Sequence, residues 1–294
     1  MNKKSEITYK LPLFFSLFAL LIAVPIRVYQ YFKLIEPQTG FYSNIDFSVY
    51  VIYILLATAM LIAIITPLVN KKNLITVTNC KKSPVFLVLS LLLGAAIIFD
   101  SAGQLMDYFD LYDQAGVSGT TVISEYVKNQ GGTFLLLQAV SGAVAAVYFL
   151  VSGLTSLNAS FDSSNLKILA LTPVIWSIFR LLYRFKRTIS FINVSDLLFE
   201  LFEIAFLMLF FLAFAQTISK IDAKTVYWKI YAYGIPAVIF SLICFLPRFI
   251  VMIVGKSELL NTHHGISYSD LFVAIFILYN LLARAKAQKT VTEE

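Results

Sequence analysis

The chain has 294 residues, of which 59% are apolar and 14% are charged, and its net charge is +6; an ordinary soluble domain is roughly 45–50% apolar and 25% charged. Its mean hydropathy is +0.80, and its basic residues lie between apolar blocks instead of along one face. This balance excludes a soluble globular enzyme, a disordered chain and a nucleic-acid-binding domain. The sequence therefore predicts a protein that lies in a lipid bilayer.

Apolar segments long enough to cross a membrane recur along the whole chain. A spanning helix needs about 20 mostly apolar residues, and the long apolar runs do not alternate in polarity as strands do. We therefore expect an all-α polytopic membrane protein that forms a single integral membrane domain over residues 1–294. Eight spans are predicted, over residues 11–32, 47–69, 85–107, 133–156, 165–184, 197–218, 227–254 and 267–285.

The first span and the loop charges set the expected orientation. Residues 11–32 lack the small-x-small cleavage signature of a signal peptide, so we expect a retained helix. With the N-terminus inside, the inner loops hold the larger share of the 23 Lys and Arg residues, as the positive-inside rule requires. Both termini are therefore expected in the cytoplasm. The acidic loop 108–131 would lie outside, where a short helix over 120–128 forms either a lid or a plain interfacial segment.

Two helix ends share one pattern. Residues 27–33 read RVYQYFK and residues 180–186 read RLLYRFK, so Arg, Phe and Lys recur at the same offsets. A duplication would relate two parallel four-helix halves, an arrangement found in some transporters. Anchoring of aromatic and basic side chains at the membrane interface explains the same pattern without a duplication.

Charged residues inside the predicted spans are the main functional signal. A charge at the bilayer centre costs about 2.5–3.5 kcal/mol even on the lenient insertion scale, so each must face protein, water or the interface. The predicted topology places these charges together in the outer leaflet: Arg27, Asp100, Arg180, Glu200, Glu203, Arg248 and Asp270. An inverted orientation would move all of them together, so their common depth does not depend on sidedness.

Helical spacing arranges several of these charges in stripes. Three sets share the spacing i, i+4, i+7, which lies on one helix face: Arg180, Arg184 and Arg187; Asp196, Glu200 and Glu203; and Asp100, Gln104 and Asp107. Folding the hairpin between the fifth and sixth spans about residues 191–192 would pair the first two sets, Arg187 with Asp196, Arg184 with Glu200 and Arg180 with Glu203.

Two interpretations of these charges stay open. In the structural one, Arg–carboxylate pairs neutralise charges that could not be buried singly, and they fix helix register. In the functional one, the arginines line a water-filled vestibule that opens to the outside, because a guanidinium pairs bidentately with carboxylate or phosphate. The prolines Pro25 and Pro247, each close to an arginine, favour broken helices at such a site. The predicted ligand-binding residues are Arg27, Arg180, Arg184 and Arg248, and the predicted pairing or proton-relay residues are Asp100, Glu200, Glu203 and Asp270.

Motifs for catalysis or metal binding are weak or missing. His263 and His264 are adjacent and point to different sides, which is poor chelating geometry. The pair Glu200-x-x-Glu203 lacks the histidine of the di-iron helical motif. The sequence contains no CxxC, Walker, GxGxxG, HExxH or GxSxG pattern. We therefore expect no catalytic residue, no metal and no cofactor.

Two short regions resemble a known group of proteins. They are Arg27-Val-Tyr-Gln-Tyr with the turn Glu36-Pro37-x-Thr39-Gly40, and Pro173-Val-Ile-Trp176-x-x-x-Arg180. Both are similar to regions of an uncharacterised multi-spanning membrane protein family of Gram-positive, clostridial-type bacteria. The resemblance implies a bacterial plasma membrane as the location, and it carries no activity.

The leading functional hypothesis is binding or transport of a small polar or anionic solute through the outer-leaflet vestibule. The alternative is a non-transporting membrane module, either a sensor or an accessory subunit of a complex, whose charge pairs are structural. A third hypothesis, an enzyme acting on a lipid head group, has carboxylates available but no recognisable nucleophile or metal motif. The expected partners are the lipid bilayer, a small anionic solute and other membrane subunits, and nucleic acid is not among them.

Overall fold

The computed structural model describes residues 3–36, 42–71, 83–117, 123–158, 163–186, 194–221, 223–260 and 266–293. Within these ranges the chain is helical and forms no strand, which confirms the all-α prediction. Seven of the described helices are long and apolar enough to cross a membrane, which fits a multi-pass membrane protein. They are α1 (Lys3–Lys33), α2 (Phe47–Val69), α3 (Pro84–Val117), α5 (Gly132–Thr155), α7 (Val194–Ile218), α8 (Ala223–Ile253) and α9 (Tyr268–Glu293).

The chain folds as two compact units. Unit 1 comprises residues 1–81 and 191–294, with helices α1, α2, α7, α8 and α9. Unit 2 comprises residues 82–190, with α3, α4 (Ile123–Asn129), α5 and α6 (Thr172–Lys186). Because the first two helices fold with the last three, this division does not follow two consecutive four-helix halves, and the internal repeat stays a prediction.

The fifth predicted span is the main departure from the expected helices. In place of a continuous helix over 165–184, the structure has 3₁₀ turns at Ser163–Leu166 and Leu169–Leu171, and then the short helix α6. Pro173 lies in the first turn of α6, where its missing N–H removes no helical hydrogen bond. Helix α6 is not among the seven helices long enough to cross a membrane, so the eighth span stays a prediction.

The predicted outer loop 108–131 is largely helical. Helix α3 continues to Val117, and α4 covers Ile123–Asn129, close to the short helix expected at 120–128. The prediction missed this extension because hydropathy marks the end of an apolar run and not the end of a helix. Within the extension, Tyr108 packs on Tyr112 one turn further along α3, at 5.5 Å between ring centroids. Gly131, with a φ of 81°, supplies the left-handed turn into α5.

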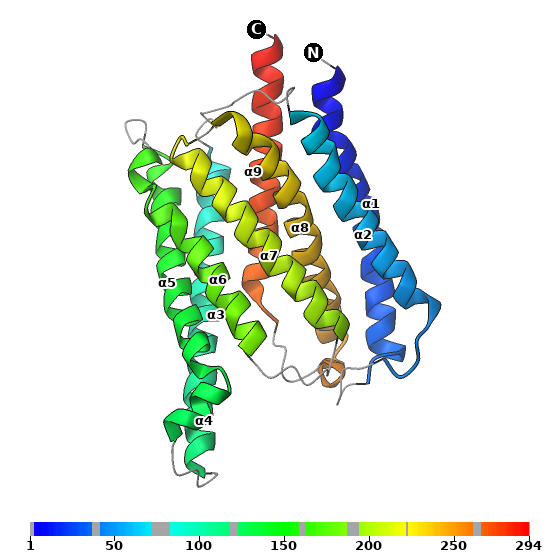
Figure 1. Cartoon of the computed structure of the whole chain (residues 1–294), viewed down its shortest axis with the longest axis vertical. Coiled ribbons are helices and arrows are strands. Elements are labelled where there is room, and N and C mark those ends of the chain that lie inside the picture. Colours follow the sequence, from blue (N-terminus) through cyan, green and yellow to red (C-terminus); the bar gives the residue numbers. More distant parts are fainter. Residues whose placement is uncertain are drawn as a thin grey trace. The chain divides into compact units, whose positions relative to one another are not determined.

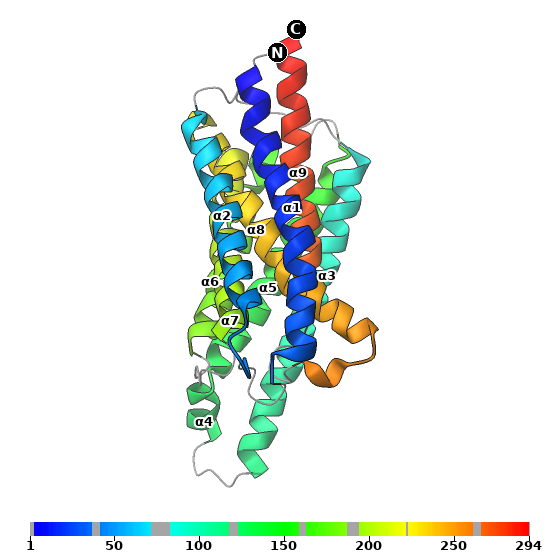
Figure 2. The same cartoon turned by 90° about the vertical axis from the view of Figure 1, so that its right-hand side faces the viewer.

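The helices of unit 1 alternate in direction. Asp196 at the start of α7 contacts Arg27 near the end of α1 and Arg248 near the end of α8. Phe245, also near the end of α8, packs on Tyr268 at the start of α9. Gln30, near the end of α1, donates to Ser48 at the start of α2 at 3.4 Å. Helices α1 and α8 therefore run one way, and α2, α7 and α9 run the other. The N-terminal end of α1 and the C-terminal end of α9 lie at the same end of unit 1 (Figures 1 and 2).

Helix α8 is the centre of unit 1. It packs against α1, α2, α7 and α9, and its face toward α7 is aromatic. Phe240 stacks on Phe202 at 5.3 Å and on Phe206 at 6.0 Å between ring centroids. These stacked rings fix the register of α7 against α8. That register sets which polar side chains meet further along α8, about two helical turns after Phe240.

In unit 2, Gly142 allows α5 to pack closely on its neighbours. A Cβ atom at this position would lie 2.5 Å from Ser101 Oγ and 3.1 Å from the Trp176 ring. We expect Gly142→Ala to lower the free energy of unfolding by about 1–3 kcal/mol because it overpacks the contact, measured as a lower unfolding temperature of the detergent-purified protein. Gly103→Ala is the control, since nothing lies within 4 Å of a Cβ there. Equal effects of the two variants would contradict the packing argument.

Candidate functional site

Buried polar side chains gather at one end of unit 1, around Asp196. We call this group the Asp196 cluster; it consists of Arg27, Gln30, Tyr31, Tyr42, Asp196, Glu200 and Arg248. All except Tyr42 are buried, and Arg27 is only 1% exposed. Charged groups buried to this degree must meet counter-charges or hydrogen-bond partners, so the contacts inside the cluster decide what it can do.

Helix α1 supplies one face of the cluster. Arg27, Gln30 and Tyr31 have the spacing i, i+3, i+4, so their side chains leave α1 on one side. Arg27 Nη1 donates to Gln30 Oε1 at 2.8 Å and to the Tyr42 hydroxyl at 2.6 Å, and Arg27 Nη2 donates to Asp196. The guanidinium also lies 5.0 Å from the ring centroid of Tyr31 and 5.5 Å from that of Phe199. Arg27 is thus held rigidly, with its charge pointed at Asp196.

Asp196 is the acceptor at which the cluster converges. The Tyr31 hydroxyl donates to its carboxylate at 2.9 Å, in addition to the bond from Arg27. Arg248 Nη2 lies 3.7 Å from Asp196 Oδ2. Asp196 also stands in the first turn of α7, where the helix dipole favours a negative charge. Two guanidinium groups and one phenol around a single carboxylate are the elements of a carboxylate-binding site.

Arg248 joins the two acidic residues of α7. Its Nη2 lies 2.8 Å from Glu200 Oε1 as well as near Asp196. Its Nε donates to the Tyr31 hydroxyl at 3.3 Å. One arginine therefore bridges two carboxylates that are one helical turn apart, and it ties α8 to both α7 and α1.

The prolines beside these arginines do not break their helices. Pro25 lies inside the continuous helix α1, and Pro247 inside the continuous helix α8. The prediction of broken helices is therefore wrong at both positions. A proline removes one helical hydrogen bond, but its fixed φ is compatible with a helix, so the helix continues where its neighbours pack against it.

The remaining predicted charges are divided between the two units. Glu203 in α7 is fully buried, and Asp270 at the start of α9 is 4% exposed and accepts from Ser267 Oγ at 3.1 Å. Both belong to unit 1, together with Arg27, Glu200 and Arg248. The residues in unit 2 are the buried Arg180, whose guanidinium lies 5.8 Å from the Trp176 ring centroid, and the half-buried Arg184 and Asp100. The roles predicted for these unit 2 residues stay predictions.

Two acidic residues of the α7 stripe have partners that the sequence did not predict. Asp196 contacts Arg27 and Arg248, and Glu200 contacts Arg248, so cations from α1 and α8 meet the acidic residues of α7. Arg187 lies outside the described residues. The pairs predicted for Arg180 and Arg184 would join unit 2 to unit 1 and stay predictions. Helix packing brings distant arginines to α7, and spacing within one hairpin does not reveal them.

Three polar residues of the cluster were missed by the sequence reasoning. Gln30 and Tyr31 carried a usable signal, because they share a helix face with Arg27. Tyr42 carried none, because its position depends on the turn after α1, where an isolated antiparallel bridge joins Ile35 to Tyr42. The hydroxyl groups of the two tyrosines supply the neutral donor and acceptor capacity that the arginines alone lack.

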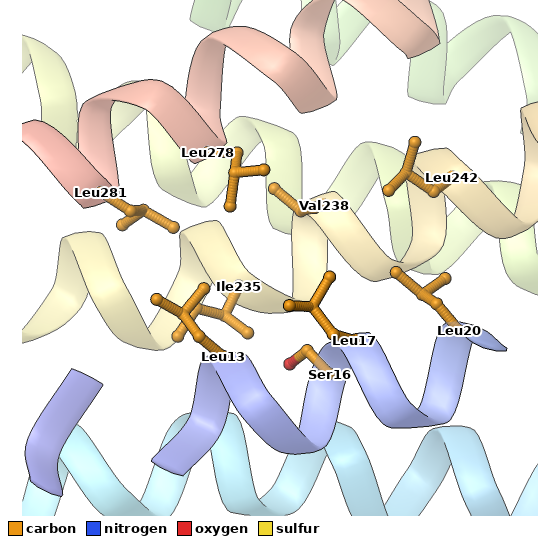
Figure 3. Close-up of a pocket in the computed structure, with 9 residues that line it drawn as sticks. All are labelled: Leu13, Ser16, Leu17, Leu20, Ile235, Val238, Leu242, Leu278 and Leu281. Atoms are coloured by element: carbon orange, nitrogen blue, oxygen red, sulfur yellow. The ribbon is translucent and has the colours of Figure 1, made fainter. Parts of the chain in front are cut away.

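An apolar cavity lies between α1, α8 and α9 (Figure 3). Its volume is about 30 Å³. Ser16 is the polar side chain among its lining residues, and its hydroxyl donates to the Pro12 carbonyl at 2.6 Å. The other lining residues are Leu13, Leu17, Leu20, Ile235, Val238, Leu242, Leu278 and Leu281. This cavity presents no group for an anion, so it is not the predicted charged vestibule, which stays a prediction.

Among the described residues, no group of three or more His, Cys, Asp or Glu side chains is arranged to hold a metal ion. His263 and His264 lie outside those residues.

No family model matches this chain, and no curated protein or solved structure matches it. The resemblance to multi-spanning proteins of Gram-positive bacteria stays a prediction.

Proposed function

We propose that this membrane protein binds or transports a small anionic solute, and that Arg27 and Arg248 are its anion-binding residues. The arrangement around Asp196 supports the proposal. Two guanidinium groups and the Tyr31 hydroxyl converge on one carboxylate inside the helix bundle. A solute anion that displaces the Asp196 side chain would meet the same donors. Under this proposal, the contacts of Asp196 are those of the state without solute, in which the chain's own carboxylate occupies the site.

Exchange of one anion for another keeps the charge of the site constant. The displaced Asp196 would not remain buried, because it lies in the first turn of α7, near the end of the bundle. Glu200 would stay bound to Arg248 at 2.8 Å, so one of the two cations would keep a counter-charge throughout. Binding that only replaces one buried carboxylate by another avoids the large penalty of an unpaired buried charge.

The same proposal includes eight spans, with both termini in the cytoplasm. In unit 1, the last residues of α2 lie at the same end of the helix bundle as the first residues of α1. Helix α7 begins at the opposite end of the bundle, with Asp196 in its first turn. The chain between α2 and α7 must then cross the membrane an odd number of times. Helices α3 and α5, which are long and apolar enough to cross a membrane, would supply two crossings, and α6 with the 3₁₀ turns before it would supply the third. The basic inner loops favour a cytoplasmic N-terminus, and a bacterial plasma membrane is the proposed location.

Thermal unfolding of the purified protein tests the anion-binding proposal. In buffers that contain acetate, succinate, phosphate or chloride, we expect at least one of these anions to raise the unfolding temperature. A ligand at 100 times its Kd adds about 2.7 kcal/mol of stability, which corresponds to roughly 5–10 °C for a chain of this size. Tyr31→Phe, which removes one donor and keeps the ring, should weaken the effect. Tyr29→Phe is the matched control, because Tyr29 is 48% exposed on the same helix. If no anion stabilises the wild type, the proposal fails.

A non-transporting membrane module, a sensor or an accessory subunit, is the second candidate. It is favoured by one observation, that Arg27 and Arg248 already contact carboxylates of the chain itself. Buried ion pairs of this kind can serve to fix helix register alone. In that case variants of the cluster would lose stability while no anion changes the unfolding temperature of the wild type, so the same measurement separates the two functions.

A further inference from the structure

A second buried arginine site lies at the opposite end of unit 1. Arg284 in α9 is 7% exposed and is separated from Asp270, at the other end of the helix, by about 21 Å of helix axis. Its Nη2 lies 3.5 Å from Thr217 Oγ1, near the end of α7. Its guanidinium lies 5.7 Å from the ring centroid of Tyr227 in α8. Three helices of unit 1 therefore surround one cation with neutral groups.

Arg284 differs from Arg27 and Arg248 in its partners. Among the described residues, no carboxylate forms an ion pair with Arg284, and its Nε has no hydrogen-bond partner. A guanidinium group stays charged in proteins, so burial costs the free energy of removing that charge from water. A buried charge without a counter-charge is strongly unfavourable. In the described part of unit 1, Arg284 is therefore the side chain that an external anion would stabilise most.

The chain around Arg284 adds positive charge at the surface. Helix α7 ends in a turn in which the Ile221 N–H donates to the Gln216 carbonyl at 3.1 Å. Lys220 in that turn has a φ of 56°, a left-handed conformation that glycine adopts without strain. The exposed Lys220 follows Thr217 by three residues, so a further positive charge lies close in the chain to the residue that Arg284 contacts.

We propose that Arg284 anchors a second anion site, which binds a phosphate group. A guanidinium offers two parallel N–H donors to phosphate oxygens, and the free Nε supplies one of them. The Thr217 hydroxyl donates to the Phe214 carbonyl at 2.6 Å and accepts from Arg284 Nη2 at 3.5 Å, so it orients the guanidinium and does not itself bind the phosphate. Because the site lies at an end of the helix bundle, the phosphate comes either from an anionic phospholipid head group or from a free phosphate in solution. The proposal is independent of the Asp196 cluster.

The experiment uses full-length protein, freed of lipid in an uncharged detergent, and compares wild type with Arg284→Met. Phosphatidylglycerol, phosphatidylcholine or inorganic phosphate is added, and binding is followed by thermal unfolding and by native mass spectrometry. We expect phosphatidylglycerol or phosphate to stabilise the wild type. Arg284→Met should bind at least about tenfold more weakly, because it loses a charge-assisted pair. Lys286→Met is the matched control, since Lys286 is exposed and lies two residues further along α9, on another face; it should behave as wild type.

The pattern across the additions identifies the source of the phosphate. Stabilisation by phosphatidylglycerol alone supports a lipid head group, and stabilisation by inorganic phosphate supports a free phosphate. If neither stabilises the wild type, or if Arg284→Met is stabilised equally, the proposal is overturned.

The anion-free protein gives a second, independent readout. Arg284→Met removes an unpaired buried charge and keeps an apolar side chain of similar length. Without added anion, its unfolding temperature should therefore be equal to or higher than that of the wild type. A lower unfolding temperature would show that Thr217 and Tyr227 already satisfy Arg284, and it would overturn the proposal.

Discussion

Asp196→Ala is expected to lower the unfolding temperature of the purified protein by roughly 10 °C, because loss of one partner from a buried ion pair costs about 3–5 kcal/mol. The substitution leaves Arg27 and Arg248 without the carboxylate at which both point, and it leaves the Tyr31 hydroxyl without its acceptor. Unfolding is followed by intrinsic fluorescence in detergent.

Formate or acetate should restore part of the stability that Asp196→Ala loses. Alanine vacates the volume of a carboxyl group between three donors, and a small carboxylate fits that space, whereas the larger succinate does not. Glu258→Ala is the control, since Glu258 is an exposed carboxylate of the same unit; it should neither lose comparable stability nor respond to formate. An unchanged unfolding temperature in Asp196→Ala would show that the cluster does not hold unit 1 together.

The second large effect is expected from Arg248→Met. This substitution removes the cation that contacts both Asp196 and Glu200, so it should lower the free energy of unfolding by about 3–5 kcal/mol. Lys256→Met removes an exposed cation just after the same helix, one that lies 5.2 Å from the Phe32 ring centroid, and it should change the free energy by less than about 1 kcal/mol.

A double-mutant cycle attributes the effect to the ion pair. Adding Glu200→Gln to Arg248→Met should recover part of the loss, because the second change removes the carboxylate that the first one strands. Coupling energies of about 0.5–3 kcal/mol are usual for residues in direct contact. Additive effects of the two substitutions would mean that the 2.8 Å contact between Arg248 and Glu200 contributes nothing, and the assignment of Arg248 as the bridging residue would be wrong.

The sequence predicted most helices well, and physical reasons explain where it did not. The predicted span 47–69 coincides with α2, Phe47–Val69, because a run of that length without charges has no stable place except a membrane helix. The polar extension of α3 to Val117 was missed, because hydropathy does not detect a helix that leaves the apolar layer. Helix α6 was predicted too long, since apolar composition before Pro173 does not show where a regular helix begins.

The candidate site was predicted in part. The arginines at positions 27 and 248 and the glutamate at 200 were chosen because charges inside apolar spans require partners, and the structure gathers them at one end of unit 1. Arg284 was not among the predicted site residues, because the sequence does not reveal that the ends of α7 and α8 cover it.

The sequence by itself determined that this is an all-helical membrane protein and which of its side chains carry charge within apolar helices, because both follow from local composition and helical period. The tertiary structure alone decided which charges meet. Asp196 pairs with arginines from α1 and α8, and Arg284 meets only neutral groups in the described part of the chain. The reason is that pairing depends on how distant helices pack, and in unit 1 the aromatic contacts of α8 with α7 set that packing.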